Sequence, residues 1–253
     1  MHFPKYWARG QATTDGANAS CWRWSDISEA DARTKADLRA GELAQLFASG
    51  SQLDRYSYGD RPLREEIIQR LDGTAVITRN LYGALVLNSA RAMFIDVDFG
   101  DTGGEGAAIQ KVQRWTAAHS ELAVRVYRTH AGLRLLVTNQ TFDPTSPDAT
   151  ALLEEVGSDK LYIQLCKAQS SFRARLTPKP WRIAIKPPPV RFPYESAEAR
   201  GHLHQWVSQY ERASQQVSVC KLLETTGPAS VLAELRPLLV VHDQLAVGDR
   251  PLA

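Results

Sequence analysis

Two aspartates inside an apolar run, Asp96 and Asp98, most constrain what this chain can fold into. The run Met93-Phe94-Ile95-Asp96-Val97-Asp98-Phe99 reads as a strand, and side chains alternate along a strand, so both carboxylates share one face. Two acids side by side in a sheet are unfavourable unless a cation lies between them. Mg²⁺ or Mn²⁺, bound through carboxylates and substrate phosphates, satisfies that need. The alternative is a strand end, at which Asp98 enters a glycine turn and Asp96 pairs with an arginine.

A second feature is a basic segment without acids, which runs from Lys160 to Tyr194. The whole chain has a formal net charge of +2, so the residues outside this segment carry −6. Aromatic residues interleave with the basic ones, a pattern typical of phosphate or nucleic-acid surfaces. A solvated loop that faces acids elsewhere is the alternative. The basic residues are Lys160, Lys167, Arg173, Arg175, Lys179, Arg182, Lys186 and Arg191, interleaved with Phe172, Trp181 and Phe192.

Composition places the chain among ordinary globular proteins. Its 253 residues and 43% hydrophobic content can bury a large core in one or two domains. No apolar run approaches the ~18 residues of a membrane-spanning helix, and the N-terminus lacks the apolar core of a signal peptide. Cys21, Cys166 and Cys220 are widely spaced, which argues against disulfides or a cysteine-based zinc site. We therefore expect a cytoplasmic protein that contacts no membrane.

Hydrophobic periodicity and turn residues predict strands mixed with helices. The segment 1–24 looks irregular, although it is rich in aromatic residues. Helices are expected at about 27–48 (capped by Asp26), 60–71, 107–119, 148–156, 161–169 and 196–216. Strands are expected at 74–78, 83–87, 92–99, 122–128, 133–138, 172–176, 181–185 and 217–223.

These elements predict an α+β fold in three parts. An aromatic N-terminal segment with helices covers 1–72, and an α+β core with the two aspartates and the basic segment covers 73–195. A helical C-terminal extension, 196–253, packs on that core. We expect the core to be a mixed or antiparallel sheet with helices, of RRM-like (ferredoxin-like) character.

The order of motifs resembles the catalytic core of the archaeo-eukaryotic primase superfamily, over roughly residues 74–185. In that superfamily an apolar strand ends in D-x-D, as Phe94 to Asp98 does. Tyr127 to Val137 occupies the place of its S-G-x-x-G-x-H-h-h-h segment, and Phe172 to Lys179 resembles its Arg, Thr and Lys near a nucleotide phosphate. The opening W-A-R-G and the segment F-R-A-R-L-T-P-K-P-W-R also resemble a group of bacterial proteins, which implies no activity.

The chain departs from the primase pattern at one point: Arg134 stands where the superfamily has histidine, and His130 lies four residues earlier, in the turn. A third metal-binding carboxylate is not evident, and Asp143 and Asp159 are the candidates. We expect Arg128 and Arg134, which flank the Gly132 turn, to reach the same edge of the sheet.

The resemblance implies a metal-dependent nucleotidyl-transfer enzyme that acts on nucleotides or nucleic acid. Phosphoryl transfer requires a metal to neutralise phosphate charge and positioned Arg or Lys to hold the phosphates. The implied metal ligands are Asp96 and Asp98, which hold Mg²⁺ or Mn²⁺, and Arg134 and His130 join them as catalytic candidates. The implied phosphate-binding residues are Arg128, Arg173, Arg175, Lys179 and Arg182.

Three other functions stay open. The chain could be a non-catalytic nucleic-acid-binding module whose acids are structural, as the replaced histidine favours. It could be a metal-dependent nuclease or phosphohydrolase that uses the same carboxylate pair. It could also be a scaffold that docks a protein partner on its aromatic N-terminus. His242-Asp243 is interpreted as a cap or turn, and the tryptophans as packing residues, with Trp181 in the basic segment as the exception.

Overall fold

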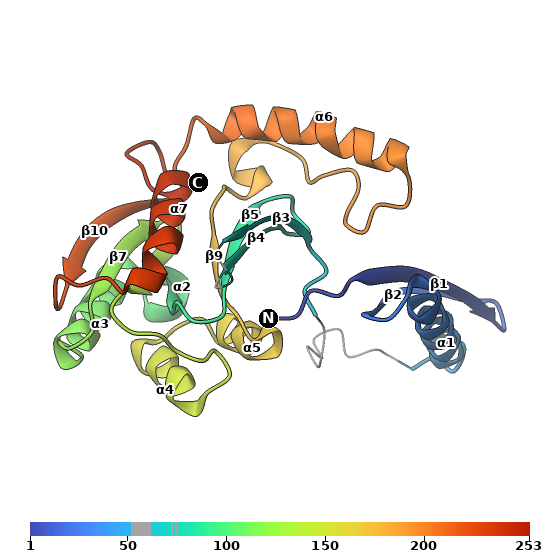
Figure 1. Cartoon of the computed structure of the whole chain (residues 1–253), viewed down its shortest axis with the longest axis horizontal. Helices are drawn as coiled ribbons and strands as arrows, with labels where there is room; N and C mark the ends of the chain where they lie inside the picture. Colours follow the sequence, from blue (N-terminus) through green and yellow to red (C-terminus); the bar gives the residue numbers. More distant parts are fainter. Residues whose placement is uncertain (52–61, 72, 74) are drawn as a thin grey trace. The chain divides into compact units, whose positions relative to one another are not determined.

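The structure, a computed structural model, describes residues 1–51, 62–71, 73 and 75–253. These residues form two compact units, His2–Arg64 and Glu65–Ala253, with Met1 assigned to the second. Helices and antiparallel sheets make up the described chain, so the predicted α+β class is confirmed (Figure 1). No helix within the described residues is both long and apolar enough to cross a membrane.

The first unit is a β-hairpin with a helix on it. Strands β1 (Tyr6–Thr14) and β2 (Ala17–Ser25) pair antiparallel, and α1 (Glu29–Ala48) packs against both. The turn residues Asp15 (φ 47°) and Gly16 (φ 79°) are both left-handed, as a tight two-residue hairpin turn requires. The prediction that 1–24 is irregular is therefore wrong.

Small residues let α1 approach the hairpin closely. Gly10 faces the helix backbone so tightly that a Cβ there would collide with the Ala36 carbonyl oxygen. Helix α1 begins one residue after Ser28, whose Oγ accepts a hydrogen bond from the Asp31 N–H at 3.1 Å. Ser28, not the predicted Asp26, is thus the cap, and Asp26 instead contacts His2 Nε2 at 2.8 Å.

The second unit contains two four-stranded antiparallel sheets. The first has the order β10-β7-β8-β6 and the second β3-β4-β5-β9. The strands are β3 (Glu66–Leu71), β4 (Ala75–Arg79), β5 (Leu85–Ser89), β6 (Phe94–Asp98), β7 (Val124–Thr129), β8 (Gly132–Val137), β9 (Phe172–Arg175) and β10 (Cys220–Thr226). The helices are α2 (Phe99–Thr102), α3 (Glu105–Ala118), α4 (Pro147–Val156), α5 (Lys160–Gln169), α6 (Ala197–Ser214) and α7 (Arg236–Ala246), with short 3₁₀ turns η1 (Pro180–Ile183) and η2 (Ala233–Leu235).

The first sheet contains a split β-α-β unit. Strands β6 and β7 flank β8, and α3 connects them. This part has the connectivity of a ferredoxin-like half. The fourth strand departs from that plan, because β10 pairs with β7 and not with β6. The α+β prediction is therefore confirmed, and its RRM-like detail is not.

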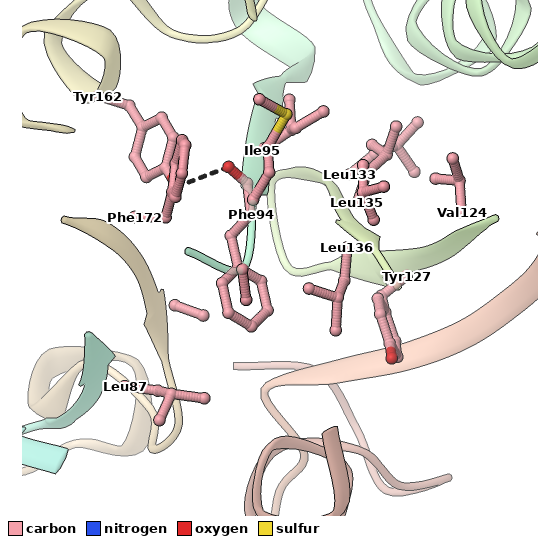
Figure 2. Packing of buried hydrophobic residues seen from close by; sticks show 14 of the residues in the cluster. Leu87, Phe94, Ile95, Val124, Tyr127, Leu133, Leu135, Leu136, Tyr162 and Phe172 are labelled. Atoms are coloured by element: carbon pink, nitrogen blue, oxygen red, sulfur yellow. Dashed lines mark hydrogen bonds between the residues drawn. The ribbon is translucent and has the colours of Figure 1, made fainter. Parts of the chain in front are cut away.

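The start of helix α5 and the two residues before it cover the outer edge of β6 in place of a strand. The Asp96 carbonyl oxygen accepts hydrogen bonds from Ser158 Oγ at 2.8 Å and from the Asp159 N–H at 3.1 Å. The Phe94 carbonyl oxygen accepts one from Tyr162 Oη at 2.8 Å (Figure 2). These contacts satisfy the edge and fix the start of α5 beside the two aspartates.

One hydrophobic core joins the two sheets of the larger unit. Leu87 of β5 and Phe172 of β9 belong to the same buried cluster as Phe94 of β6 (Figure 2). The other face of the first sheet, which carries Ile95 and Leu135, belongs to the cluster that includes residues of α3 and α4. Burial on both faces makes this sheet a rigid base for the carboxylates.

Three expectations for this unit need correction. The helix expected over 60–71 falls partly on residues 52–61, outside the described chain, and Glu66–Leu71 is strand β3, because pairing with β4 outweighs local propensity. The strand expected at 181–185 is the turn η1, which begins at Pro180. The segment 196–253 is more than a helical extension, since β10 completes the first sheet.

Candidate functional site

The two aspartates lie on one face of β6, at the edge of the first sheet. Asp96 pairs in register with Arg134 of β8, and Asp98 pairs with Gly132. Gly132 lets β8 approach β6 closely, because a Cβ there would collide with the Val97 carbonyl oxygen and lie 3.2 Å from Asp98 Oδ1. The sequence therefore presents one half-buried carboxylate, Asp96, and one exposed carboxylate, Asp98, on a shared face.

Arg134 lies on β8 directly across from Asp96 and is fully buried, with 1% of its surface exposed. Its Nε donates to Asp96 Oδ1 at 3.3 Å, and its Nη1 donates to the Arg175 carbonyl oxygen at 2.8 Å. Burial lowers the pKa of this guanidinium, but Asp96 and neighbouring polar groups outweigh burial and hold it above its ordinary value. Arg134 thus stays charged and links β6, β8 and β9.

A buried polar chain continues from Arg134 into helix α7. His242 Nε2 lies 3.5 Å from Arg134 Nη1, and His242 Nδ1 lies 2.9 Å from Asp243 Oδ1. Asp243 also accepts hydrogen bonds from Tyr127 Oη at 2.9 Å and from Arg125 Nη2 at 2.7 Å. A neutral imidazole that donates from Nδ1 to Asp243 and accepts at Nε2 from Arg134 satisfies every group in this chain.

Burial first, and the Arg134 and Arg125 charges next, hold the pKa of His242 below its ordinary value, while Asp243 opposes them. The pair lies inside α7, not at a cap or turn as its sequence suggested. The signal that could have found it is helical spacing, because His242 lies four residues from both Leu238 and Ala246, the other buried residues of α7.

Three cations of the basic segment gather near the carboxylates. Lys179 and Arg182 lie close enough to Asp98 for their charges to interact, and Arg175 is that close to Asp96. The buried Nε of Arg175 has no hydrogen-bond partner. No ion pair joins Arg175, Lys179 or Arg182 to any acid of the described chain, so their charges are available to a ligand.

Burial and neighbouring positive charges lower the pKa values of Arg175 and Lys179, and burial lowers the pKa of Arg182. Burial and then the Arg134 charge lower the pKa of Arg175 to about 10. Burial, followed by the charges of Arg175 and Arg182, lowers the pKa of Lys179, while Asp98 partly opposes them. A bound anion would raise the pKa of each of these groups again, because an opposite charge favours the protonated form.

The pKa of Asp98 is raised above its ordinary value. Although its side chain is exposed, the surrounding protein removes part of its hydration, and this raises the pKa of its carboxyl group. The negative charges of Asp96, Asp159 and Asp101 raise it further, and Lys179 opposes them. Acids and bases therefore meet on one surface without neutralising each other fully.

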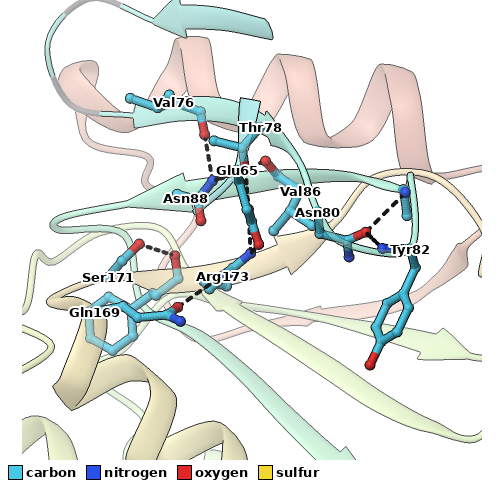
Figure 3. A network of polar contacts seen from close by, with 12 residues as sticks. Glu65, Val76, Thr78, Asn80, Tyr82, Val86, Asn88, Gln169, Ser171 and Arg173 are labelled. Atoms are coloured by element: carbon cyan, nitrogen blue, oxygen red, sulfur yellow. Dashed lines mark hydrogen bonds and ion pairs between the residues drawn. The ribbon is translucent and has the colours of Figure 1, made fainter. Parts of the chain in front are cut away.

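Three candidates from the sequence have other partners. Arg173 donates to both carboxylate oxygens of Glu65, at 2.7 and 2.8 Å, and to Gln169 at 2.7 Å (Figure 3). Arg128 binds Glu105 of α3 at 2.6 Å through Nε and at 2.9 Å through Nη2. His130 Nδ1 lies 3.0 Å from the Leu252 carbonyl oxygen. None of the three takes part in the gathering around Asp98.

The expectation that Arg128 and Arg134 reach the same edge is wrong for a geometric reason. Arg134 pairs with Tyr127 and Arg128 pairs with Leu133, so the two arginines lie on opposite faces of the sheet. Arg173 and Arg175 do alternate along β9 as predicted, but Glu65 binds only the first. The ion pairs of Arg128 and Arg173 make them structural residues.

The donor set near Asp98 suits a hard cation only in part. The described residues contain no group of three or more His, Cys, Asp or Glu side chains arranged to hold a metal. Asp159 lies near Asp98, but its Oδ1 caps α5 by accepting from the Leu161 N–H at 2.9 Å. Asp143 accepts from Thr145 in a separate loop. Asp96 and Asp98 are therefore the two carboxylates that could hold a hard cation here, and Mg²⁺ in such a site takes its other ligands from water and substrate phosphates.

The comparisons add no family to this geometry. No protein-family model, no curated protein and no solved structure matches the chain. The likeness to the primase superfamily accordingly rests on the three motifs alone. The side chains around Asp96 and Asp98 are therefore what indicates a function for this chain.

Proposed function

We propose that the chain is a metal-dependent enzyme that transfers nucleotidyl groups, with its active site at Asp96 and Asp98. One observation carries the proposal: Arg175, Lys179 and Arg182, none of which is paired with an acid in the described chain, gather beside a carboxylate pair. A nucleoside triphosphate with a divalent cation supplies counter-charges to both groups, since the metal neutralises the carboxylates and the phosphates neutralise the cations.

Each residue has a defined role in this proposal. Asp96 and Asp98 hold Mg²⁺ or Mn²⁺, which would supply charge neutralisation at the phosphate under attack. Lys179 and Arg182 bind the phosphates farther from the metal, and Arg175 holds them from the buried side. Arg134 takes no part in binding substrate; it fixes the Asp96 carboxylate and the Arg175 backbone in place.

Because two carboxylates supply only part of the ligands that Mg²⁺ or Mn²⁺ takes, we expect metal and nucleotide to bind together. Titration calorimetry with Mn²⁺ alone, and with Mn²⁺ plus a non-hydrolysable nucleoside triphosphate, measures this coupling. The nucleotide is expected to tighten Mn²⁺ binding at least tenfold, and Asp98→Asn is expected to abolish the gain. Asp143→Asn is the matched control, since it removes a carboxylate from a separate loop.

Binding of the phosphates is tested separately. Lys179→Ala is expected to weaken nucleotide binding by about 10- to 100-fold, the loss of one hydrogen bond between charged groups. Lys221→Ala, which removes an exposed lysine on β10, leaves it unchanged. Incubation with labelled nucleotide and a primed template then distinguishes the reactions: strand extension supports nucleotidyl transfer, and strand shortening identifies a nuclease instead.

A second candidate is a nucleic-acid-binding module without catalysis. The ion pair between Arg134 and Asp96 favours it, because one acid of the pair already has a cationic partner. In that case binding to nucleic acid depends on salt and survives the double change Asp96→Asn with Asp98→Asn. If neither Mn²⁺, nucleotide nor nucleic acid binds, both candidates are refuted.

A further inference from the structure

Two exposed aromatic side chains, Tyr82 and Trp181, contact each other close to Lys179 and Arg182, and neither belongs to the hydrophobic core. Tyr82 has 49% of its surface exposed and Trp181 has 50%. Their ring centroids are 5.2 Å apart, and the planes are nearly perpendicular, at 89°. About half of each side chain is therefore accessible to a flat ligand.

Both aromatic residues are mounted on fixed turns. Tyr82 projects from the β4–β5 turn, where Asn80 Oδ1 accepts hydrogen bonds from the N–H groups of Tyr82 at 3.0 Å and Ala84 at 3.1 Å (Figure 3). Trp181 follows Pro180, which is buried and anchors η1. The rings are therefore preorganised, which lowers the entropy lost when a ligand binds.

A further set of contacts fixes the segment that carries Trp181. Thr177 Oγ1 accepts from the Leu85 N–H at 2.8 Å, and it lies 2.8 Å from Tyr210 Oη of α6. Tyr210 Oη donates its proton to the Pro178 carbonyl oxygen at 2.5 Å. These bonds hold the segment between β5 and α6.

The aromatic pair adjoins the phosphate-binding cations. Lys179 Nζ lies 5.5 Å from the centre of the Trp181 ring, and Arg182 directly follows Trp181 in the chain. Both cations interact electrostatically with Asp98. An aromatic surface beside a basic groove is the arrangement by which proteins bind single-stranded nucleic acid, because bases stack on the rings while the backbone meets the cations.

We infer that Tyr82 and Trp181 form a stacking platform for an unpaired nucleobase, so that the ligand of this site is a single strand or its nucleotide. The inference rests on the proposed function and names its substrate class. The base lies on Trp181, and its phosphates extend past Lys179 and Arg182 toward Asp98. Duplex nucleic acid, whose bases are already stacked, gains nothing from the platform.

The test compares a fluorescently labelled thymidine 12-mer with an abasic oligomer of the same length, by fluorescence anisotropy at fixed salt. Trp181→Ala is expected to weaken binding of the thymidine oligomer by about 5- to 100-fold, the loss of one stacked base, and to leave the abasic oligomer unchanged. Trp181→Phe retains most of the affinity. Leu223→Ala, which removes an exposed apolar side chain from β10, is the control, and thermal unfolding verifies that every variant folds.

A Trp181→Ala variant that binds the thymidine oligomer like the wild-type chain overturns the inference, and so does an equal loss for the abasic oligomer. Lys179→Ala separates this failure from that of the proposed function, since loss of phosphate grip weakens both oligomers alike. If Lys179→Ala weakens binding and Trp181→Ala does not, only the platform is refuted. If the wild-type chain binds neither oligomer, the platform is also refuted. The mononucleotide dTMP, titrated in parallel, distinguishes a free nucleotide from a strand.

Discussion

Replacing Arg134 with methionine gives a sharp test of how the site is built. The change keeps most of the side-chain length but removes the guanidinium that joins Asp96, the Arg175 carbonyl oxygen and His242. Breaking a buried ion pair typically costs about 3–5 kcal/mol, because one partner is left buried without a counter-charge. Asp96 is 36% exposed through its side chain, so water rehydrates part of its charge. We therefore expect the lower end, about 3 kcal/mol.

The assay is urea unfolding followed by circular dichroism, with thermal unfolding beside it. A loss of about 3 kcal/mol corresponds to a fall in Tm of about 6–12 °C for a unit of this size. Arg128→Met is the matched control, since it removes the same residue type from a partly exposed pair with Glu105. An exposed pair contributes about 0–1 kcal/mol. If Arg134→Met and Arg128→Met destabilise the chain equally, the interpretation of Arg134 as a buried link is refuted.

Three further predictions follow from burial, charge and close approach. Asp98→Asn raises Tm at neutral pH, because the raised pKa of Asp98 in the folded chain makes its ionised carboxylate unfavourable there. The gain in Tm vanishes below the ordinary pKa of 3.8, and no gain at pH 7 contradicts the raised pKa of Asp98. The wild-type chain loses stability as pH falls through 6.5, since the pKa of His242 is lowered and the unfolded chain binds the proton more readily; urea titrations of His242→Gln show a flatter profile there. Gly10→Ala destabilises the first unit by about 1–3 kcal/mol in thermal unfolding, because its Cβ would collide with helix α1, whereas Gly41→Ala, which has open space, stabilises it by up to about 1 kcal/mol.

Strong periodic segments in the middle of the chain could be predicted from sequence. The alternation around Asp96 and the helical spacing of Ile109, Val112 and Trp115 gave β6 and α3 within about two residues. Strands β4 and β5 were found for the same reason, since an Asn-containing turn separates two apolar runs.

The N-terminal hairpin was missed although a local signal exists. Asp15-Gly16 is a dipeptide that favours a two-residue hairpin turn, and its flanks pair from Tyr6–Ser25 inward. Its strands mix small, polar and aromatic residues without clean alternation, so the period gave no strand signal. Strand β3 was missed for a different reason, because only pairing with β4 determines its conformation.

Side-chain partners account for what the sequence could not reveal about the site. Alternation placed Asp96 and Asp98 on one face, but nothing local shows that Arg173 binds Glu65 while Arg175 keeps a buried Nε without a partner. His242 lies 108 residues from Arg134, and only tertiary packing brings them together. Such long-range contacts leave no trace in spacing or composition.

The place of β10 and α7 in the larger unit has a consequence for synthesis of the chain. Strand β10 pairs with β7, and α7 supplies His242 and Asp243 to the buried polar chain. A ribosome delivers β6, β7 and β8 about a hundred residues before these last elements. Until they are synthesised, β7 lacks its partner strand and Arg134 lacks His242, and an unpaired strand edge favours aggregation.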